Sequence, residues 1–159
     1  MPIHIHGAEN LRDLFCLLHD GTISHGSWEG SDLVLEVEIA YLAARVAPSF
    51  CKFYLRLVNV RHLRFTTWPN ATASGPVVLS EMTQIFQPEL QILEGNLQDG
   101  VIQVVCNQRS SAFDYSGGEL FFMADGAQLT DEAGKYYAME TLGSLCKEYW
   151  DDWASGSRV

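Results

Sequence analysis

The sequence is poor in basic residues and contains no long apolar run. Only 10 of the 159 residues are Lys or Arg, against 20 Asp and Glu, so the formal net charge is −10. Non-specific binding to nucleic acid or to an anionic membrane needs a positive surface, so we expect neither partner and favour a basic protein instead. No stretch reaches the roughly 18 apolar residues of a membrane-spanning helix, and the N-terminus has no signal-peptide pattern, which predicts a cytoplasmic protein.

The chain also lacks the short motifs of common active sites and cofactor sites. It has no G-x-S-x-G nucleophile elbow, no P-loop and no Gly-rich dinucleotide-binding turn. Its four cysteines form no C-x-x-C pair, and we interpret them as reduced and mostly buried. His4 and His6 would supply two metal ligands, whereas a zinc site needs three or four. We therefore expect no cofactor and no metal, and the sequence leaves catalysis open while favouring a non-enzymatic role.

The sequence does have enough apolar and aromatic side chains for one core. Hydrophobic residues make up 47% of a chain whose length is ordinary for a single domain. Alternating apolar residues between turn signals predict six strands, over residues 22–28, 32–42, 52–67, 89–97, 101–108 and 118–125. Within 52–67 the apolar phase shifts near Asn59, which either a β-bulge or a division into two strands would produce, and we favour a long bulged strand. Asp99-Gly100 predicts a type I′ hairpin turn.

Two helices are predicted from apolar residues at helical spacing. Residues 11–18 form a short amphipathic pattern, with Asn10 as its N-cap and Asp20-Gly21 as its end. A wide apolar stripe predicts a longer helix over 136–153, followed by a frayed tail over 154–159. The predicted fold is a single α+β domain: a twisted, mostly antiparallel sheet with a short N-terminal helix and a longer C-terminal helix packed on one face. The expected core residues are Leu33, Leu35, Val37, Ile39, Phe53, Leu55, Leu57, Val104, Leu120, Phe122, Leu142, Leu145 and Trp150.

The basic residues are concentrated in one part of this acidic chain. Residues 43–68 contain five cations and no acidic side chain, namely Arg45, Lys52, Arg56, Arg61 and Arg64. The interpretation that we favour is pairing with acidic side chains on neighbouring strands. The alternative is a basic patch around Arg56, Arg61 and Arg64 that binds an anion or a second subunit.

Two further pairs of polar residues are candidates for function. His19 and Asp20 are expected to end the first helix, with the His19 ring bonding the last helical carbonyls. Alternatively, they are the centre of a small metal-dependent hydrolase, with other histidines brought close by the fold. Asp151 and Asp152 stand near the end of the last predicted helix, where they oppose the helix dipole, as a surface for a cationic partner would require.

The run Leu18-His19-Asp20-Gly21, followed by the segments LVLEVEIAYL and FYLRLVNVRHLRFTTW, resembles a set of small bacterial proteins of uncharacterised function. Some similar proteins are classed among the immunity proteins of polymorphic toxin systems, which neutralise a toxin by binding it. The likeness covers about residues 11–68. It implies an α+β fold and a protein-binding role, and it brings no catalytic residues.

These observations give three hypotheses for function. The preferred one is a noncatalytic protein-binding domain, for instance of immunity type, that presents acidic surface to a basic partner. The others are a metal-dependent hydrolase at His19 and Asp20, and an anion-binding or self-associating module that uses the basic strand 52–64. The candidate binding residues are His19, Asp20, Arg56, Arg61, Arg64, Asp151 and Asp152.

Overall fold

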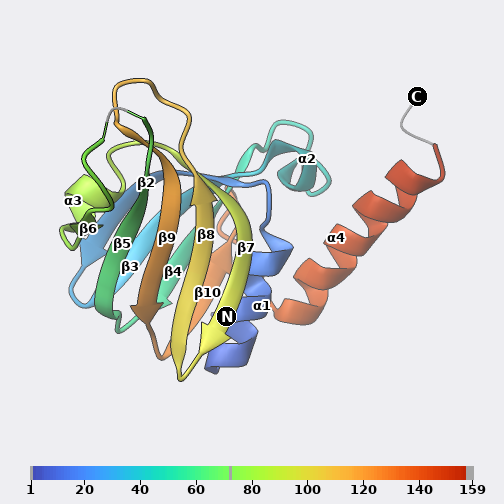
Figure 1. Cartoon of the computed structure of the whole chain (residues 1–159). Helices are drawn as coiled ribbons and strands as arrows, with labels where there is room; N and C mark the ends of the chain where they lie inside the picture. Colours follow the sequence, from blue (N-terminus) through green and yellow to red (C-terminus); the bar gives the residue numbers. More distant parts are fainter. Residues whose placement is uncertain (1, 72, 157–159) are drawn as a thin grey trace.

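The computed structural model describes residues 2–71 and 73–156 and is an α+β fold built on one open antiparallel sheet (Figure 1). The helices in the described residues are α1 (Ala8–Leu17), α2 (Ala40–Ala43), α3 (Met82–Ile85) and α4 (Met139–Ala154). The strands are β1 (Ile5–His6), β2 (Thr22–Glu29), β3 (Asp32–Glu38), β4 (Lys52–Val58), β5 (Arg61–Pro69), β6 (Val78–Leu79), β7 (Leu90–Gln98), β8 (Val101–Asn107), β9 (Tyr115–Met123), β10 (Gly126–Thr130) and β11 (Tyr136–Tyr137). None of these helices is long and apolar enough to cross a membrane.

The sheet consists of two halves joined by a short seam. Its strand order is β1-β10-β4-β3-β2-β7-β8-β9-β5-β6, with β11 paired to β10. At the seam, β2 pairs with β7 only through Thr22–Gln91 and Ile23–Leu90. In Figure 1 the strands β7, β8, β9 and β5 stand in front of β3 and β4, and buried side chains from both halves form a single apolar core. The predicted fold class is therefore confirmed.

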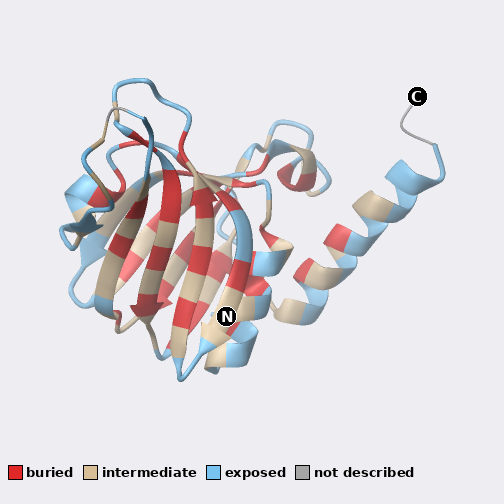
Figure 2. Cartoon of the chain, viewed as in Figure 1, coloured by how far each residue is buried: buried red, intermediate tan, exposed pale blue. Residues whose placement is uncertain are grey.

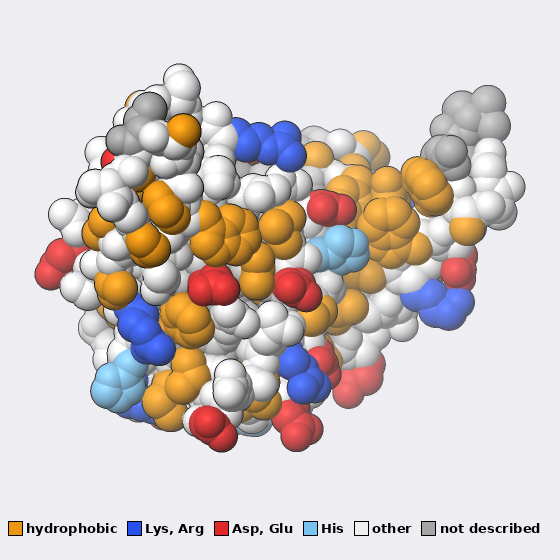
Figure 3. Space-filling model, in the orientation of Figure 1, with side chains coloured by type: hydrophobic (Ala, Val, Ile, Leu, Met, Phe, Trp, Pro, Cys, Tyr) orange, Lys and Arg blue, Asp and Glu red, His pale blue; other side chains and the backbone are white. Residues whose placement is uncertain are grey.

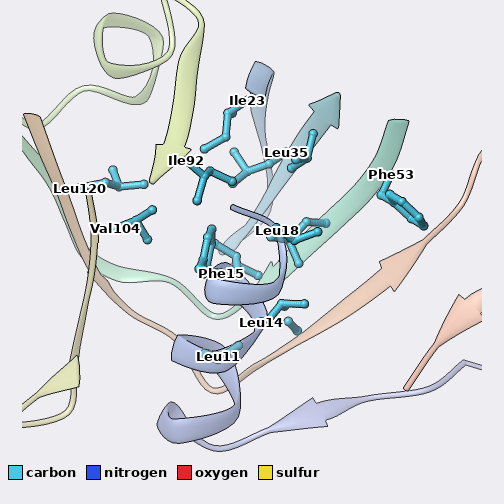
Figure 4. Packing of buried hydrophobic residues seen from close by; sticks show 14 of the residues in the cluster. Leu11, Leu14, Phe15, Leu18, Ile23, Leu35, Phe53, Ile92, Val104 and Leu120 are labelled. Carbon is cyan, nitrogen blue, oxygen red and sulfur yellow. The ribbon is translucent and has the colours of Figure 1, made fainter. Parts of the chain in front are cut away.

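Helix α1 supplies much of the core because its apolar stripe faces the sheet. Leu11, Leu14 and Phe15, with Leu18 just after the helix, are fully buried against side chains of both halves (Figure 4). The predicted spacing is confirmed, but the predicted start is wrong. The helix begins at Ala8 with Gly7 as its N-cap at φ 90°, whereas the Asn10 amide donates to the His6 carbonyl at 2.9 Å.

The predicted single strand over 52–67 is wrong, because the chain turns a corner at Asn59. β4 ends at Val58 and pairs with β3 and β10, whereas β5 pairs with β9 and β6 in the other half of the sheet. Asn59 has φ 52°, in the left-handed region that Asn tolerates, and its N–H donates to Asp32 Oδ1 at 2.9 Å. The phase shift in the sequence marked this corner.

Other boundaries differ from the prediction by a few residues. The strand predicted over 32–42 ends at Glu38, after which α2 begins, and β10 was missed. The last helix begins at Met139, and two residues of the predicted helix form β11 instead. The hairpin is confirmed, since Asp99 and Gly100 both have positive φ, at 53° and 78°. Of the predicted tail, Ala154 ends α4, residues 155–156 follow as a turn, and 157–159 lie outside the described residues.

Helix α4 packs on α1 and α2 along one side and leaves much of its surface in solvent. Every predicted core residue is buried except two on this helix, Leu145 and Trp150, which are half-buried. The main contacts of α4 are with α1 and α2, and its buried side chains are Leu142 and Cys146. Its last residues, 151–154, are all exposed, and this end of the helix is mainly pale blue in Figure 2. Aromatic side chains in the last turns are therefore left at the surface.

Candidate functional site

The His19-Asp20 pair ends helix α1 and turns the chain into β2. Asp20 has φ 69°, and its N–H donates to the Ile92 carbonyl at 2.8 Å. The His19 Nδ1 lies 2.8 Å from the Cys16 carbonyl oxygen, which only accepts, so Nδ1 carries the proton and donates. The pair thus caps the helix end, as the Asp-Gly turn predicted.

The His19 ring also contacts the C-terminal helix. It stacks on the indole of Trp150 with the ring centroids 5.7 Å apart and the planes 13° from parallel. The Asp20 carboxylate lies 3.8 Å from His19 Nε2, and its side chain is 51% exposed. The two candidate residues therefore lie at the edge of a surface formed mainly by aromatic rings.

This aromatic surface comprises four side chains from α2 and α4: Tyr41, Tyr149, Trp150 and Trp153. The rings of Tyr41 and Tyr149 are 4.4 Å apart, those of Tyr149 and Trp150 5.0 Å, and those of Trp150 and Trp153 6.1 Å. Trp153 is 46% exposed and the other three are half-buried. In Figure 3 hydrophobic side chains gather between the sheet and the far end of α4, next to a histidine and an acidic residue. The rings form one contiguous patch.

Polar contacts behind the rings fix the aromatic surface to α1. The Tyr41 hydroxyl donates to the His19 carbonyl at 3.1 Å, and burial raises the pKa of Tyr41, so the phenol stays neutral. The Cys146 thiol lies 3.6 Å from the Leu17 carbonyl, and burial raises its pKa to about 11. A cysteine in this state is a packed thiol and not a nucleophile at neutral pH.

Asp151 and Asp152 already have cationic partners within the chain. Asp152 pairs with Arg45, whose guanidinium also lies 6.0 Å from the centre of the Tyr149 ring, and Asp151 pairs with Lys147 one helical turn earlier. These pairs offset the unfavourable position of two acids near a helix C-terminus. Both carboxylates nevertheless remain more than half exposed, at 64% and 55%. Asp152, next to Arg45, and Asp20, next to His19, form an acidic border beside the aromatic rings, whereas helical spacing places Asp151 on the opposite side of α4.

The histidines do not gather into a metal site. His4 and His6 stack on each other at 5.7 Å, beside β10 rather than His19, and His25 and His62 lie on β2 and β5. Within residues 2–71 and 73–156, no three His, Cys, Asp or Glu side chains are placed to share a metal ion. The hydrolase hypothesis therefore gains no support from the geometry.

The cysteines are free but only partly buried. Cys106 and Cys146 are buried, and burial raises the pKa of Cys106 to about 12. Cys16 and Cys51 are exposed, so the expectation of mostly buried thiols holds for two of the four. The exposed Cys16 still donates from its thiol to the Gly95 carbonyl on β7 at 3.3 Å, and Cys51 precedes β4 in a loop.

Most of the basic segment pairs with carboxylates on neighbouring elements. Arg56 donates to Asp32 at 3.0 Å and also to Glu29, and Arg61 donates to Asp125 at 2.9 Å. Lys52 pairs in the same way with Glu36 at 2.7 Å. Arg64 differs, since its guanidinium lies over the Phe121 ring at 4.6 Å. Arg56 and Arg64 belong to different halves of the sheet, so the candidate arginines form no common patch.

The pairing of Asp32 predicts a loss of stability in acid. The Asn59 N–H, and then Arg56, lower the pKa of Asp32 below its ordinary value. A lowered pKa in the folded state stabilises the protein above the unfolded-state pKa, and this contribution disappears as the pH falls through the lowered value. Asp32→Asn should therefore be less stable than the native protein at neutral pH, and should lose less stability on acidification below about pH 4. Urea unfolding at neutral pH and below about pH 4 measures the free energy of unfolding of both proteins. Exposed Glu94→Gln is the control. An equal loss of unfolding free energy on acidification in all three proteins would contradict the prediction.

No protein-family model, curated protein or solved structure matches the chain. The geometry therefore has to carry the functional argument. The sequence indicated His19, Asp20 and the two C-terminal acids, but it missed Tyr41 and Tyr149 and assigned Trp150 to the core. The available signal was the width of the apolar stripe on α4, which exceeds what its contacts with α1 and α2 bury.

Proposed function

We propose that this chain is a noncatalytic protein-binding domain that binds its partner through the aromatic surface. The observation that carries the proposal is the contiguous, partly exposed set of Tyr and Trp rings on α2 and on the C-terminal part of α4. Tyr and Trp dominate the binding energy of protein interfaces, because they bury a large area at a low cost in side-chain entropy. The contacts to α1 and α2 hold the rings in place before binding.

The acidic border favours a basic partner. Asp20 and Asp152 flank the rings, and the whole chain carries a net charge of −10. Lys and Arg side chains of a partner would stack on the indole faces and approach these carboxylates. The overall charge would also speed up association at low salt. A toxin neutralised by an immunity protein would be one such partner, and the support for that narrower role is the resemblance over residues 11–68.

The test compares tryptophans inside and outside the aromatic surface. A partner recovered from the native cell by cross-linking at low salt, once identified, is titrated with the native protein and with Trp153→Ala, Trp150→Ala and Trp28→Ala. Trp28, on β2, is 41% exposed and is not part of the aromatic surface, so it is the matched control. We expect Trp150→Ala and Trp153→Ala to weaken binding by about tenfold or more, and Trp28→Ala to leave it unchanged.

Two further measurements keep this test interpretable. Circular dichroism and urea unfolding establish that each variant is folded, which matters most for half-buried Trp150. Raising the salt concentration should weaken binding by the native protein, since the acidic border contributes through charge. Equal affinities in Trp153→Ala and Trp28→Ala, or a partner that binds equally at all salt concentrations, would refute the proposal.

A further inference from the structure

A row of four side chains crosses the outer face of the sheet half that contains β7, β8, β9 and β5, away from the aromatic surface. Asn96 on β7 is paired in register with Gln103 on β8, Gln103 with Phe121 on β9, and Phe121 with Arg64 on β5. The next residues along three of these strands, Val104, Phe122 and Phe65, are buried. Because successive side chains of a strand point to opposite faces, the row faces solvent.

An irregularity in β5 determines where Arg64 lies. The pairing of β5 with β9 shifts register between Arg61 and Arg64, and His62 within the shift has φ 58°. β-bulges of this kind redirect the side chains that follow them. Here Arg64 is directly opposite Phe121, with its guanidinium 4.6 Å from the ring centre.

The guanidinium of Arg64 keeps most of its hydrogen-bonding capacity. Its one protein hydrogen bond among the described residues goes from Nη1 to the His62 carbonyl at 3.3 Å, and no described carboxylate is within ion-pair distance. A guanidinium has five N–H donors in a planar fork. Stacking on Phe121 fixes the plane of that fork while its edge stays accessible.

Arg64, Phe121, Gln103 and Asn96 line a hollow of about 490 Å³, with Asp99 also at its wall. The Asn96 amide donates to Gln103 Oε1 at 3.2 Å, which leaves the Gln103 amide N–H groups as further donors. We propose that this hollow is a binding site for a carboxylate group, held by the Arg64 fork and assisted by Gln103. A planar carboxylate matches a guanidinium in a bidentate manner. Because Arg64 is the one cation among the described residues that line this hollow and Asp99 also lines it, a monoanion fits the site better than a multiply charged phosphate.

This site is independent of the proposed function, because none of its residues belongs to the aromatic surface. The carboxylate comes either from a small molecule or from an acidic side chain of another protein, including a second copy of this chain. In each case the recognising chemistry is the same. The experiment therefore has two arms. One tests whether the hollow binds a carboxylate, and the other tests whether that carboxylate comes from a second copy of the chain.

The first arm is an NMR titration of the whole chain with acetate and, separately, with inorganic phosphate, at constant ionic strength. We expect saturable acetate-dependent shifts at the Arg64 Nε–H and Gln103 amide signals, with phosphate binding more weakly. Arg64→Gln should weaken acetate binding by about tenfold or more, since hydrogen bonds from charged donors are lost. Asp99→Asn should tighten it by roughly two- to threefold, since a repelling charge is removed.

The matched control is Arg109→Gln, which removes the same charge from a different hollow, where Arg109 donates to Gln91 Oε1 at 3.0 Å. If Arg109→Gln weakens acetate binding as much as Arg64→Gln, the effect is one of overall charge and the proposal fails. It also fails if phosphate binds as tightly as acetate or if the shifts do not saturate. Sedimentation over a range of protein concentrations identifies the source: association that Arg64→Gln abolishes points to a second copy, and unchanged monomers in both proteins point to another carboxylate.

Discussion

Replacing Gly118 with alanine is expected to lower the free energy of unfolding by about 3 kcal/mol or more. Gly118 lies within β9, paired with Thr67 on β5 and with Cys106 on β8. A Cβ at this position would lie 2.6 Å from the Phe65 ring and even closer to the Thr66 carbonyl oxygen. The Thr66 carbonyl belongs to the backbone of a strand that is paired on both sides, so it has no room to move. The methyl group would therefore push β9 away from β5 and disrupt the pairing of these two strands.

Gly143→Ala is the matched control for this prediction. Gly143 lies in α4, and a Cβ there would have no heavy atom within 4 Å. Alanine is the better helix former by roughly 0.5–1 kcal/mol, so this variant should be slightly more stable than the native protein. Urea unfolding of the three proteins gives both differences. A stable Gly118→Ala, or a loss of stability in Gly143→Ala that equals it, would contradict the packing described for β9.

The elements that depend on local pattern could be predicted from the sequence. β3 alternates strictly, and Leu33, Leu35 and Val37 are buried as that alternation requires. The turn at Asp99-Gly100 needs two residues at positive φ, and Asp-Gly is a dipeptide that adopts these angles readily. The corner at Asn59 could not be assigned in the same way, because a phase shift is compatible with both a bulge and a new strand. The choice depends on Asp32, whose carboxylate holds the Asn59 N–H from a distant part of the sequence.

The candidate site could be predicted only in part, for the same physical reason. His19 and Asp20 are recognisable because they end a helix, and the C-terminal acids because they oppose its dipole. The contact between His19 and Trp150 joins opposite ends of the sequence, and no local pattern encodes it. The burial of Trp150 likewise depends on how far α4 extends past α1 and α2, which the apolar stripe alone does not reveal.

Because Trp150 packs on His19 at the end of α1, α1 is the element that connects the core to the aromatic surface. Its inner side packs on β7 so closely that a Cβ at Gly95 would lie 2.7 Å from the Arg12 carbonyl. Its C-terminal end carries His19 and the Leu17 carbonyl that Cys146 contacts. A change in the core beneath α1 should therefore affect both stability and the position of α4.

Phe15→Ala is the substitution that tests this connection, and it is expected to cost about 3–5 kcal/mol of unfolding free energy. Phe15 is fully buried, and its ring meets that of Phe122 edge-on at 5.8 Å, so alanine would leave a cavity between α1 and the sheet. Asp13→Ala, in the same helix but at a side chain that is 51% exposed, should change stability by less than about 0.5 kcal/mol. Urea unfolding measures both losses.

Tryptophan fluorescence under native conditions adds a readout at the aromatic surface. If α1 positions α4, Phe15→Ala should make the tryptophan emission more solvent-exposed and quenchable before global unfolding, whereas Asp13→Ala should not. Trp150→Phe in the same background identifies the contribution of the indole that stacks on His19. A Phe15→Ala protein that loses stability while Trp150 keeps its native emission would show that α4 is held independently of the core. In that case the contacts of α2, above all Tyr41 and Arg45, would be what holds the aromatic surface in place.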